Sequence, residues 1–370
     1  MVKILYDHQV FSISKYGGAA RYITKLIQEL SRQTPWDLKI YCGLYMNKFI
    51  IELNRKNKIG YFFPRLPKID SVIRSIINDQ LNSIYLNTTT PPDIYHQTLY
   101  KPIKVDSKTS IILTLYDLIH EKLNTIMRTS TNYHQDQIVD EKYKSIKNAK
   151  HIICISENTK NDLTDLYNVR EDKISVIYLA TDIDKYIVSK PPIDGPYLLY
   201  VGQRNGYKNF KNFIYAYANN LKINNEFKIV CFGQGTFKKE EYGIIKKIKN
   251  YNQKIIHIEG SDILLASLYK YATALIYPSF YEGFGLPLIE AMRLKCPVIC
   301  SATNCFNEIA RNSAKYFNPY EIESISSAIE KVIFSEKTLN QMKEIGYIQS
   351  NKYTWENTAI HTKEIYSKFL

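Results

Sequence analysis

The sequence lacks long hydrophobic runs and uses cysteine sparingly. No run of eighteen or more apolar residues occurs, so we expect no membrane-spanning helix. The start, MVKILYDHQVF, lacks the layout of a signal peptide, and we expect a cytoplasmic protein. The six cysteines are scattered without a CxxC motif. They favour buried thiols in a reduced compartment over a metal site.

Charge of one sign is in excess, since the formal net charge is +13. Nucleic acid, an anionic membrane surface and an anionic nucleotide ligand are the partner classes that such a charge suits. No recognised nucleic-acid motif occurs, and the lysines are spread along the chain instead of forming one stripe. We therefore predict no nucleic-acid partner. Frequent Ile, Asn, Lys and Tyr also suggest an AT-rich coding bias, which explains part of the charge.

Strand-like and helix-like patterns alternate along 370 residues, enough for two domains. The clearest linker is residues 186–195, YIVSKPPIDG, with a proline pair and a glycine. The predicted domains are residues 1–185 and 196–354, each an α/β unit with a parallel sheet.

The most informative stretch is ALIYPSFYEGFGLPLIEAM, residues 274–292. Ala274 to Tyr277 reads as a buried parallel strand, and a turn with two glycines follows it. Pro287 suits the first turn of a helix, where its missing N–H costs nothing. The stretch therefore predicts strand, glycine turn and helix, with the helix N-terminus at the carboxyl edge of a sheet. In α/β folds this edge binds phosphate-bearing ligands.

Two carboxylates, Glu282 and Glu290, lie in this unit with seven residues between them. Compensation of the helix dipole is one reading of Glu290. As a pair within EGFG-LP-EA-M, the two carboxylates resemble the E-x7-E motif of the retaining glycosyltransferases of family 4. The positions in register are Pro278, Ser279, Glu282, Gly283, Phe284, Gly285, Pro287, Glu290 and Ala291.

The resemblance covers nearly the whole chain and implies the GT-B fold, two Rossmann-like domains facing an interdomain cleft. A helix at about residues 355–370 is expected to pack back on the N-terminal domain. The implied activity is retaining, metal-independent transfer of a hexose from a UDP- or GDP-sugar, of mannosyl or glucosyl type, to a glycan or lipid-linked acceptor. No cofactor or metal is expected, and no DxD-type motif stands at a predicted donor position.

The resemblance also assigns residues to the donor. Arg204 and Lys208, which follow the glycine loop at Gly202, are expected to neutralise the leaving diphosphate, although two solvated cations are the alternative. Glu282 is expected to bind the transferred sugar, and Glu290 the ribose. The remaining predicted donor contacts are Gly17, Gly18, Gly283, Phe284, Gly285 and Leu286.

The acceptor side is predicted at Tyr116 and Asp117, which follow a strand at residues 110–115. Many family members have a histidine before this aspartate, where this chain has Tyr116. Asp117 is expected to contact the acceptor hydroxyl, with His96 or His120 as neighbours. A structural role is the alternative for each of these four residues.

Residues 48–85 are basic and irregular. Cations alternate with apolar side chains, a pattern that suits either an anionic membrane face or an acceptor grip. A solvated amphipathic helix is the simpler interpretation, and we favour it. The residues concerned are Arg55, Lys56, Lys58, Arg65, Lys68 and Arg74, with Phe62, Phe63, Ile69, Val72, Ile73 and Ile76.

Three other classes compete with a transferase. A GT-B epimerase or phosphorylase fits the Lys208 position and the EGFG context less well. A catalytically silent nucleotide-sugar-binding subunit of a glycan-assembly complex is the principal alternative, and Tyr116 is the feature that favours it. A nucleic-acid binder ranks third. The sequence leaves the sugar, base, acceptor, linkage and oligomeric state open.

Overall fold

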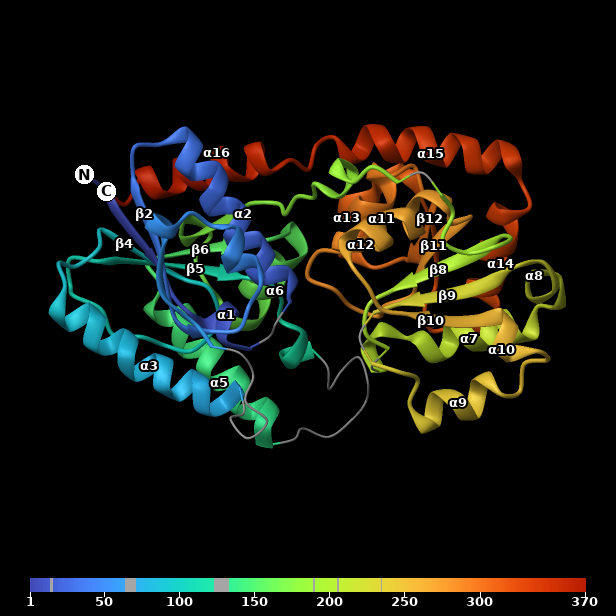
Figure 1. The fold of residues 1–370 in the computed structure, drawn as a ribbon, viewed down its shortest axis with the longest axis horizontal. Helices are drawn as coiled ribbons and strands as arrows, with labels where there is room; N and C mark the ends of the chain where they lie inside the picture. Colours follow the sequence, from blue (N-terminus) through green and yellow to red (C-terminus); the bar gives the residue numbers. More distant parts are fainter. Residues whose placement is uncertain (14–15, 64–70, 123–132, 189, 205, 234) are drawn as a thin grey trace. The chain divides into compact units, whose positions relative to one another are not determined.

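A computed structural model describes the chain apart from residues 14–15, 64–70, 123–132, 189, 205 and 234 (Figure 1). It forms two units. Unit 1 comprises residues 1–121, 130–179 and 355–370, and unit 2 comprises residues 122–129 and 180–354. The change between units at Leu179 and Ala180 precedes the predicted linker. Within that linker, the carbonyls of Val188 and Lys190 accept hydrogen bonds from Lys270 and Ser267, which attach it to unit 2.

Unit 1 contains a parallel sheet in the order β3-β2-β1-β4-β5-β6-β7. Short apolar runs form these strands because helices cover both faces of a parallel sheet. The strands are β1 (Lys3–Tyr6), β2 (Asp37–Tyr45), β3 (Lys58–Phe62), β4 (Ile94–Gln97), β5 (Ser110–Leu115), β6 (His151–Cys154) and β7 (Ile174–Val176). The helices are α1 (Gln9–Ile13), α2 (Gly18–Gln33), α3 (Ser71–Thr88), α5 (Tyr133–Asn148), α6 (Glu157–Tyr167) and α16 (Trp355–Ser367), with 3-10 turns η1 (Phe49–Glu52), η2 (Arg55–Asn57) and η3 (Glu171–Lys173).

Unit 2 contains a second parallel sheet, in the order β10-β9-β8-β11-β12-β13. Its strands are β8 (Tyr197–Val201), β9 (Lys228–Phe232), β10 (Ile255–Ile258), β11 (Ala274–Tyr277), β12 (Val298–Ser301) and β13 (Ala314–Phe317). Its helices are α7 (Phe210–Asn219), α8 (Leu221–Glu226), α9 (Lys239–Ile245), α10 (Tyr251–Lys254), α11 (Asp262–Tyr271), α12 (Leu286–Arg293), α13 (Asn304–Ala310), α14 (Ile322–Ile333) and α15 (Glu336–Ser350), with 3-10 turns η4 (Ile183–Lys185), η5 (Gly206–Lys208) and η6 (Arg311–Ser313).

Helix α16 completes the core of unit 1. Trp355, at its start, stacks on Tyr22 of α2 with ring centroids 6.3 Å apart. Near its end, the hydroxyl of Tyr366 donates to that of Tyr6 in β1 over 2.9 Å. Figure 1 shows α16 beside α2. The last helix is therefore bonded to the first strand of the chain.

Helix α3 differs from the expected solvated amphipathic helix. The basic stretch contains the unpredicted edge strand β3 before the helix begins. Within the helix, Arg74, Asn78 and Asn82 are buried, whereas Ile76 and Ile84 are exposed. Three polar side chains of α3 thus point into the domain, while Gln80 and Ser83 are exposed beside the isoleucines. The predicted members Arg65, Lys68 and Ile69 lie outside the described residues, as does the side chain of Val72.

Among the described residues, no helix is both long and apolar enough to cross a bilayer. All six cysteines are buried and free, as the sequence predicts. Burial raises the pKa of Cys42 to about 12 and that of Cys296 to about 12, so these thiols stay protonated.

Candidate functional site

The predicted donor residues of unit 2 follow two neighbouring strands. In this sheet the chain passes from β8 to β9 on one side, and β11 leads to β12 on the other. The two central strands therefore meet at a topological switch point, where open α/β sheets bind ligands outside the carboxyl ends of their strands. The glycine loop at Gly202 leaves β8, and the turn with Glu282 leaves β11. The fold thus brings these two sequence motifs to one sheet edge.

Lys208 and Glu282 are in direct contact at this edge. Lys208 Nζ lies 2.5 Å from Glu282 Oε1, and both side chains are largely buried. The same carboxylate oxygen accepts hydrogen bonds from Ser279 Oγ at 2.7 Å and from the Tyr277 hydroxyl at 3.0 Å. Burial raises the pKa of Tyr277 well above its usual value, and the charge of Glu282 raises it further, so the phenol remains a donor. A cation and a carboxylate are thus held together by a strand and a turn.

Glu290 lies in α12 and is buried. Its Oε2 accepts a hydrogen bond from the Tyr269 hydroxyl of α11 at 3.0 Å. The residue before α12, Gly285, has φ +103°, and a Cβ there would lie 3.1 Å from the Phe306 ring. A glycine is therefore required at this position. Of the two glycines in the turn, Gly285 has a left-handed conformation and Gly283 does not.

Two further predicted donor residues flank that glycine. Phe284 is buried, and its carbonyl accepts from Cys305 Sγ at 2.8 Å, while Leu286 opens α12 and is half-buried. The expected contact of backbone N–H groups with the sugar remains a prediction. Gly202 has φ +121°, and a Cβ on Gly233 would lie 2.6 Å from the Gly202 carbonyl oxygen, so the two strand ends approach closely.

Arg204 has an ion pair and hydrogen bonds of its own. Its Nε donates to Glu241 Oε1 at 2.9 Å, and its Nη2 donates to the carbonyls of Gly235 and Thr236 at 2.5 and 3.0 Å. The guanidinium lies 4.8 Å from the ring centroid of Phe237. Its side chain is 5% exposed, and Nη1 has no hydrogen-bond partner among the described residues. Arg204 holds the loop after β9, and its predicted contact with a diphosphate remains a prediction.

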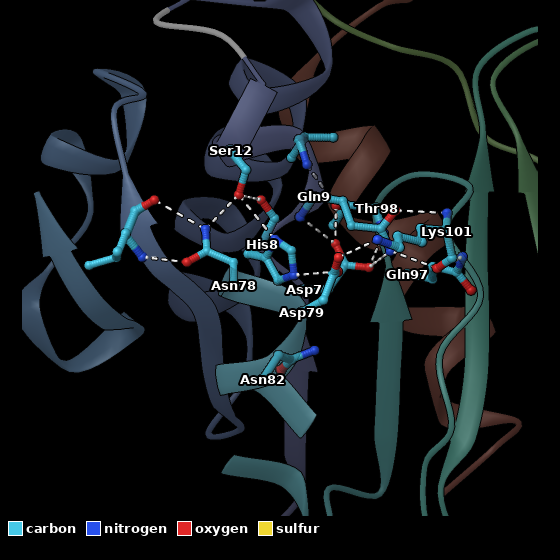
Figure 2. A network of polar contacts seen from close by, with 12 residues as sticks. Asp7, His8, Gln9, Ser12, Asn78, Asp79, Asn82, Gln97, Thr98 and Lys101 are labelled. Atoms are coloured by element: carbon cyan, nitrogen blue, oxygen red, sulfur yellow. Dashed lines mark hydrogen bonds and ion pairs between the residues drawn. The ribbon is translucent and has the colours of Figure 1, made fainter. Parts of the chain in front are cut away.

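In unit 1 the switch point lies between β1 and β4, and a polar network fills it (Figure 2). Asp7 follows β1 and is buried. Its carboxylate accepts from Gln9 N at 3.1 Å, Gln9 Nε2 at 2.8 Å, Thr98 N at 3.2 Å and the Thr98 hydroxyl. Burial raises the pKa of Asp7 to about 6 despite these donors and the nearby His8. The Asp7 carboxylate thus joins the ends of β1 and β4 by hydrogen bonds.

The network continues outward to a charged group. His8 Nε2 lies 3.2 Å from Asp79 of α3, which also pairs with Lys101. Lys101 N donates to Gln9 Oε1 at 2.9 Å. Gln97 donates through Nε2 to Ser145 Oγ at 2.8 Å, but its buried Oε1 has no hydrogen-bond partner among the described residues. Figure 2 shows these side chains clustered between α1 and the loop after β4.

Tyr116 and Asp117 follow β5, the next strand of this sheet. The Tyr116 hydroxyl is buried and has no hydrogen-bond partner within the described part of the chain. Asp117 is half-buried, and its Oδ1 accepts from Ile119 N at 3.1 Å, which closes a local turn. His120 lies in the helical segment that follows and is also half-buried. The predicted acceptor contact of these residues remains a prediction.

A buried ion pair fixes this turn. Lys142 of α5 is fully buried and lies 2.9 Å from Glu121. Its Nζ also donates to the Asp117 carbonyl at 3.1 Å, and the Tyr167 hydroxyl donates to Glu121 at 3.0 Å. A buried charge pair of this kind is tolerated only with good geometry and extra hydrogen bonds, both of which are present. The backbone of Asp117 is therefore held from beneath.

The structure contradicts the prediction for His96 as an acceptor-side residue. His96 is completely buried, with Nε2 2.7 Å from Thr114 Oγ1 and Nδ1 bonded to the Tyr366 hydroxyl of α16. Burial lowers its pKa to about 3, so the ring is neutral. Both ring nitrogens are occupied, and the residue belongs to the core beneath α16.

The glycine pair of unit 1 marks the start of α2. Gly17 is the N-cap residue with extended backbone, φ −178°, and Gly18 is the first helical residue. The short helix α1, which the sequence did not predict, separates this pair from β1. A helix N-terminus with no side chain in its first two positions suits an anion. Contact with donor phosphates remains a prediction for both glycines. Among the described residues, no cluster of His, Cys, Asp and Glu suits a metal ion.

Residues 184–349 match the family model "Glycosyl transferases group 1", and residues 16–185 match "Glycosyltransferase Family 4". The chain belongs to this glycosyltransferase family. The family resemblance inferred from residues 274–292 is thereby confirmed. Both models meet close to the change of unit in the structure.

A curated relative of this chain is the O-antigen chain mannosyltransferase RfbU of Salmonella typhimurium. It is 32% identical over 224 residues, which span 58% of this chain and 62% of the relative. The matched part is thus less than two thirds of the relative's length.

Two solved structures share the fold over almost the whole length. Sucrose-phosphate synthase from Thermosynechococcus elongatus has a TM-score of 0.76 and 16% identity, with 100% of this chain and 99% of that chain covered. HepE from Anabaena, in complex with UDP and glucose, has a TM-score of 0.73 and 16% identity, with 99% and 100% covered. These likenesses confirm the GT-B class with its two Rossmann-like domains.

Sequence reasoning missed several residues of the candidate site. Glu241, the partner of Arg204, lies 37 positions away in a helix that gave no motif. Asp7 and Gln9 had a usable signal, because polar residues directly after a first buried strand lie at the ligand-binding edge of the sheet. Lys142 and Glu121 gave none, since a charge within a polar helix normally faces water.

Proposed function

We propose that this protein transfers a hexose from a nucleotide-diphosphate sugar to a hydroxyl of a glycan or lipid-linked acceptor. The observation that carries the proposal is the Lys208–Glu282 pair at the switch point of unit 2. A donor needs a cation at its diphosphate and an acceptor of hydrogen bonds at its sugar hydroxyls, and this pair supplies both.

In this proposal Lys208 leaves Glu282 for the diphosphate when the donor binds. The ammonium then stabilises the negative charge that develops on the leaving phosphate as the glycosidic bond breaks. Glu282, still held by Ser279 and Tyr277, accepts from the sugar hydroxyls. Glu290, oriented by Tyr269, accepts from the ribose. Because Lys208 supplies the positive charge, the proposed reaction needs no divalent cation.

The relatives support the choice of donor. RfbU is named as a mannosyltransferase, and the HepE structure holds UDP and glucose. We therefore propose a mannosyl or glucosyl donor carrying UDP or GDP. Asp117, whose backbone is held by Lys142, is proposed to bind the acceptor hydroxyl. Retention of configuration is proposed through a front-face path, in which the leaving phosphate oxygen takes the acceptor proton.

The alternative is a catalytically silent nucleotide-sugar-binding subunit of a glycan-assembly complex. Tyr116, which stands where many family members have histidine, is the observation that favours it. Its buried hydroxyl has no hydrogen-bond partner among the described residues and cannot replace a ring nitrogen as a base at neutral pH, because burial raises its pKa well above the usual value.

The test is a donor panel. The purified protein is screened by thermal shift against UDP-, GDP- and dTDP-sugars, and the stabilising donor is then incubated with and without candidate glycan acceptors. We expect one donor to stabilise the protein. We also expect the protein to release the nucleotide diphosphate of that donor slowly when no acceptor is present. Lys208→Ala is expected to lower that release by roughly 100-fold. A donor that binds but is never turned over would support the silent subunit instead.

A further inference from the structure

A groove opens on unit 2 between the corner where α7 meets α8 and the adjoining side of α14. Its volume is about 940 Å³, near the upper end of the range of roughly 300–1,000 Å³ that small-molecule sites occupy. Asn220 and Lys222 border it at the corner, Glu330 borders it on α14, and Phe334 borders it just beyond the end of α14. We call it the α14 groove.

The α14 groove lies at the edge of the sheet opposite to the proposed donor position. A helix that connects two parallel strands returns the chain from the carboxyl edge of the sheet to its amino edge. Helix α7 begins at Phe210, after the loop that contains Gly202 and Lys208, so its end at Asn219 lies at the amino edge. Figure 1 accordingly shows α8 and α14 at the end of unit 2 that is away from α12. The groove is therefore separate from the site around Glu282.

The polar side of the α14 groove is held in place by its own hydrogen bonds. Asn220 Nδ2 donates to Ser326 Oγ at 3.0 Å and to Glu330 Oε2 at 2.8 Å, and Lys222 Nζ lies 3.4 Å from Glu330 Oε1. Hydrogen bonds from Asn220 and Lys222 lower the pKa of the Glu330 carboxyl, so it is ionised at neutral pH. An ionised carboxylate has about four positions that accept hydrogen bonds, so Glu330 can accept further ones from a ligand.

The apolar side of the α14 groove is built around Phe334. Its half-buried ring packs edge-on against Phe227 of the core, with ring centroids 5.7 Å apart. Lys222 Nζ lies 3.9 Å from the same ring centroid, so this side chain joins the apolar side to the polar side. Leu221, which is 72% exposed, and Ile322 add further apolar surface. A ligand in this groove therefore meets hydrocarbon and hydrogen-bonding groups together.

Charge in the α14 groove selects the class of ligand. The cations Lys222 and Lys331 are balanced by the acids Glu323 and Glu330, although the whole chain has a net charge of +13. A nucleotide or a phosphate needs an excess of cations. A protein partner needs an apolar core, whereas amide and hydroxyl side chains outnumber the apolar ones here. A neutral sugar chain, with many hydroxyls and with apolar C–H faces on its rings, matches both sides of the groove.

We infer that the α14 groove binds a segment of a neutral oligosaccharide. Glu323, Glu330 and the amide of Asn220 bond sugar hydroxyls, and Phe334 contacts the C–H face of a ring. The inference rests on the proposed function only for the source of the sugar, a glycan acceptor held at a point remote from its reacting end. Such a second contact raises the effective concentration of the chain at the reacting site.

The experiment is isothermal titration calorimetry of the full-length protein with neutral tetrasaccharides. The probes are α-mannotetraose and maltotetraose, with a heparin-derived tetrasaccharide as the anionic counterpart. We expect at least one neutral tetrasaccharide to bind saturably. Glu323→Ala/Lys331→Ala, which leaves the net charge unchanged, should weaken this binding by roughly tenfold or more, because charge-assisted hydrogen bonds are lost. The heparin tetrasaccharide should bind the parent and this variant equally.

A matched control is Lys239→Ala/Glu240→Ala in α9. It replaces the same two residue types, all four residues are exposed, and Glu240, like Glu323, lies in the first turn of its helix. This control should keep the parent affinity, and both double variants should keep the parent thermal midpoint. Ser327→Arg, which places a long side chain in the groove from an exposed position, should weaken the neutral tetrasaccharide as strongly as Glu323→Ala/Lys331→Ala.

Three results would overturn the inference. The first is that no neutral tetrasaccharide binds, or that the groove variants bind it as the parent does. The second is that only the heparin tetrasaccharide loses affinity, which would indicate an anion site. The third is that Asp117→Asn alone abolishes binding of the neutral probe, which would place the sugar at the predicted acceptor position. Release of nucleotide diphosphate without acceptor should be unchanged in the groove variants, so failure of the groove and failure of the proposed function are distinguishable.

Discussion

Lys208 Nζ lies 2.5 Å from Glu282 Oε1, so the predicted diphosphate-binding cation and the predicted sugar-binding carboxylate hold each other. Because both side chains are largely buried, removal of either one leaves the other charge without its partner. The pair therefore couples stability to the proposed chemistry.

Lys208→Met and Glu282→Gln each remove one member of this pair. We expect each to lower transfer by roughly 100-fold or more, because a fixed charge at the transition state is lost. Each is also expected to destabilise the fold by up to about 3 kcal/mol, whereas the double variant recovers part of that loss. Denaturant unfolding and initial rates are measured for the parent, the two single variants and the double variant, which together form a double-mutant cycle. Full activity in either single variant would remove the pair from the reaction.

Arg204 and Glu241 provide a contrasting pair. Since Arg204 is bonded to Glu241 and two carbonyls, Arg204→Met is expected to destabilise unit 2 by about 3 kcal/mol. Glu241→Gln keeps the length of the side chain and should cost less. Chemical denaturation measures both. If Arg204→Met instead keeps the parent stability and only lowers turnover, that result would support the predicted direct contact with the diphosphate.

Tyr269→Phe removes the hydroxyl that donates to Glu290 at 3.0 Å. The carboxylate then loses an orienting bond worth about 1 kcal/mol, so we expect the donor KM to rise several-fold. The acceptor KM should not change, because Glu290 is assigned to the ribose. Steady-state kinetics, with the donor and the acceptor varied in turn, measures the two KM values separately. A change confined to the acceptor KM would assign Glu290 elsewhere.

Gly285→Ala tests the turn before α12. The left-handed φ of +103° and the Phe306 ring 3.1 Å from the added Cβ predict a loss of at least about 1 kcal/mol. Gly243→Ala in α9 is the matched control, because nothing lies within 4 Å of its Cβ. Alanine there should stabilise the protein by up to about 1 kcal/mol. In thermal unfolding, Gly285→Ala should therefore lower the midpoint and Gly243→Ala should raise it.

His96→Gln tests the pH dependence of stability. Burial lowers the pKa of His96 to about 3, while an unfolded chain protonates it below about 6.5. Its contribution is therefore complete above pH 6.5 and is lost as the pH falls toward 3. As the pH falls through this window, the free energy of unfolding of the parent should decrease by roughly 1.4 kcal/mol per pH unit relative to the variant. A constant difference in the free energy of unfolding across the window would contradict the burial of a neutral ring.

Local patterns predicted the strands that lead to the two candidate sites. Ser110–Leu115 and Ala274–Tyr277 were predicted with their observed bounds, because a buried parallel strand is a continuous apolar run between polar turns. The edge strand β3 was missed. Its residues are half-buried or exposed, so no apolar run marks it.

Side-chain partnerships were the part that sequence could not supply. The motif placed Glu282 correctly beside Lys208, since both follow central strands of one sheet. It gave no sign that Arg204 turns to Glu241, because that depends on packing against Phe237. Likewise, histidine spacing could not show that His96 faces α16, a helix 259 positions later in the chain (355 − 96). The burial of Asn78 and Asn82 in α3 was also hidden, since composition does not show which side of a helix faces the core.

The position of α16 has a consequence for biosynthesis. Unit 1 closes over His96 and Tyr6 only when this helix docks, yet the ribosome makes all of residues 180–354 first. Unit 1 therefore cannot complete its core until unit 2 has been synthesised, and the apolar surface that α16 covers stays exposed until then. Nascent chains halted before Trp355 should bind chaperones through this exposed surface. Adding α16 as a separate peptide should release the chaperones.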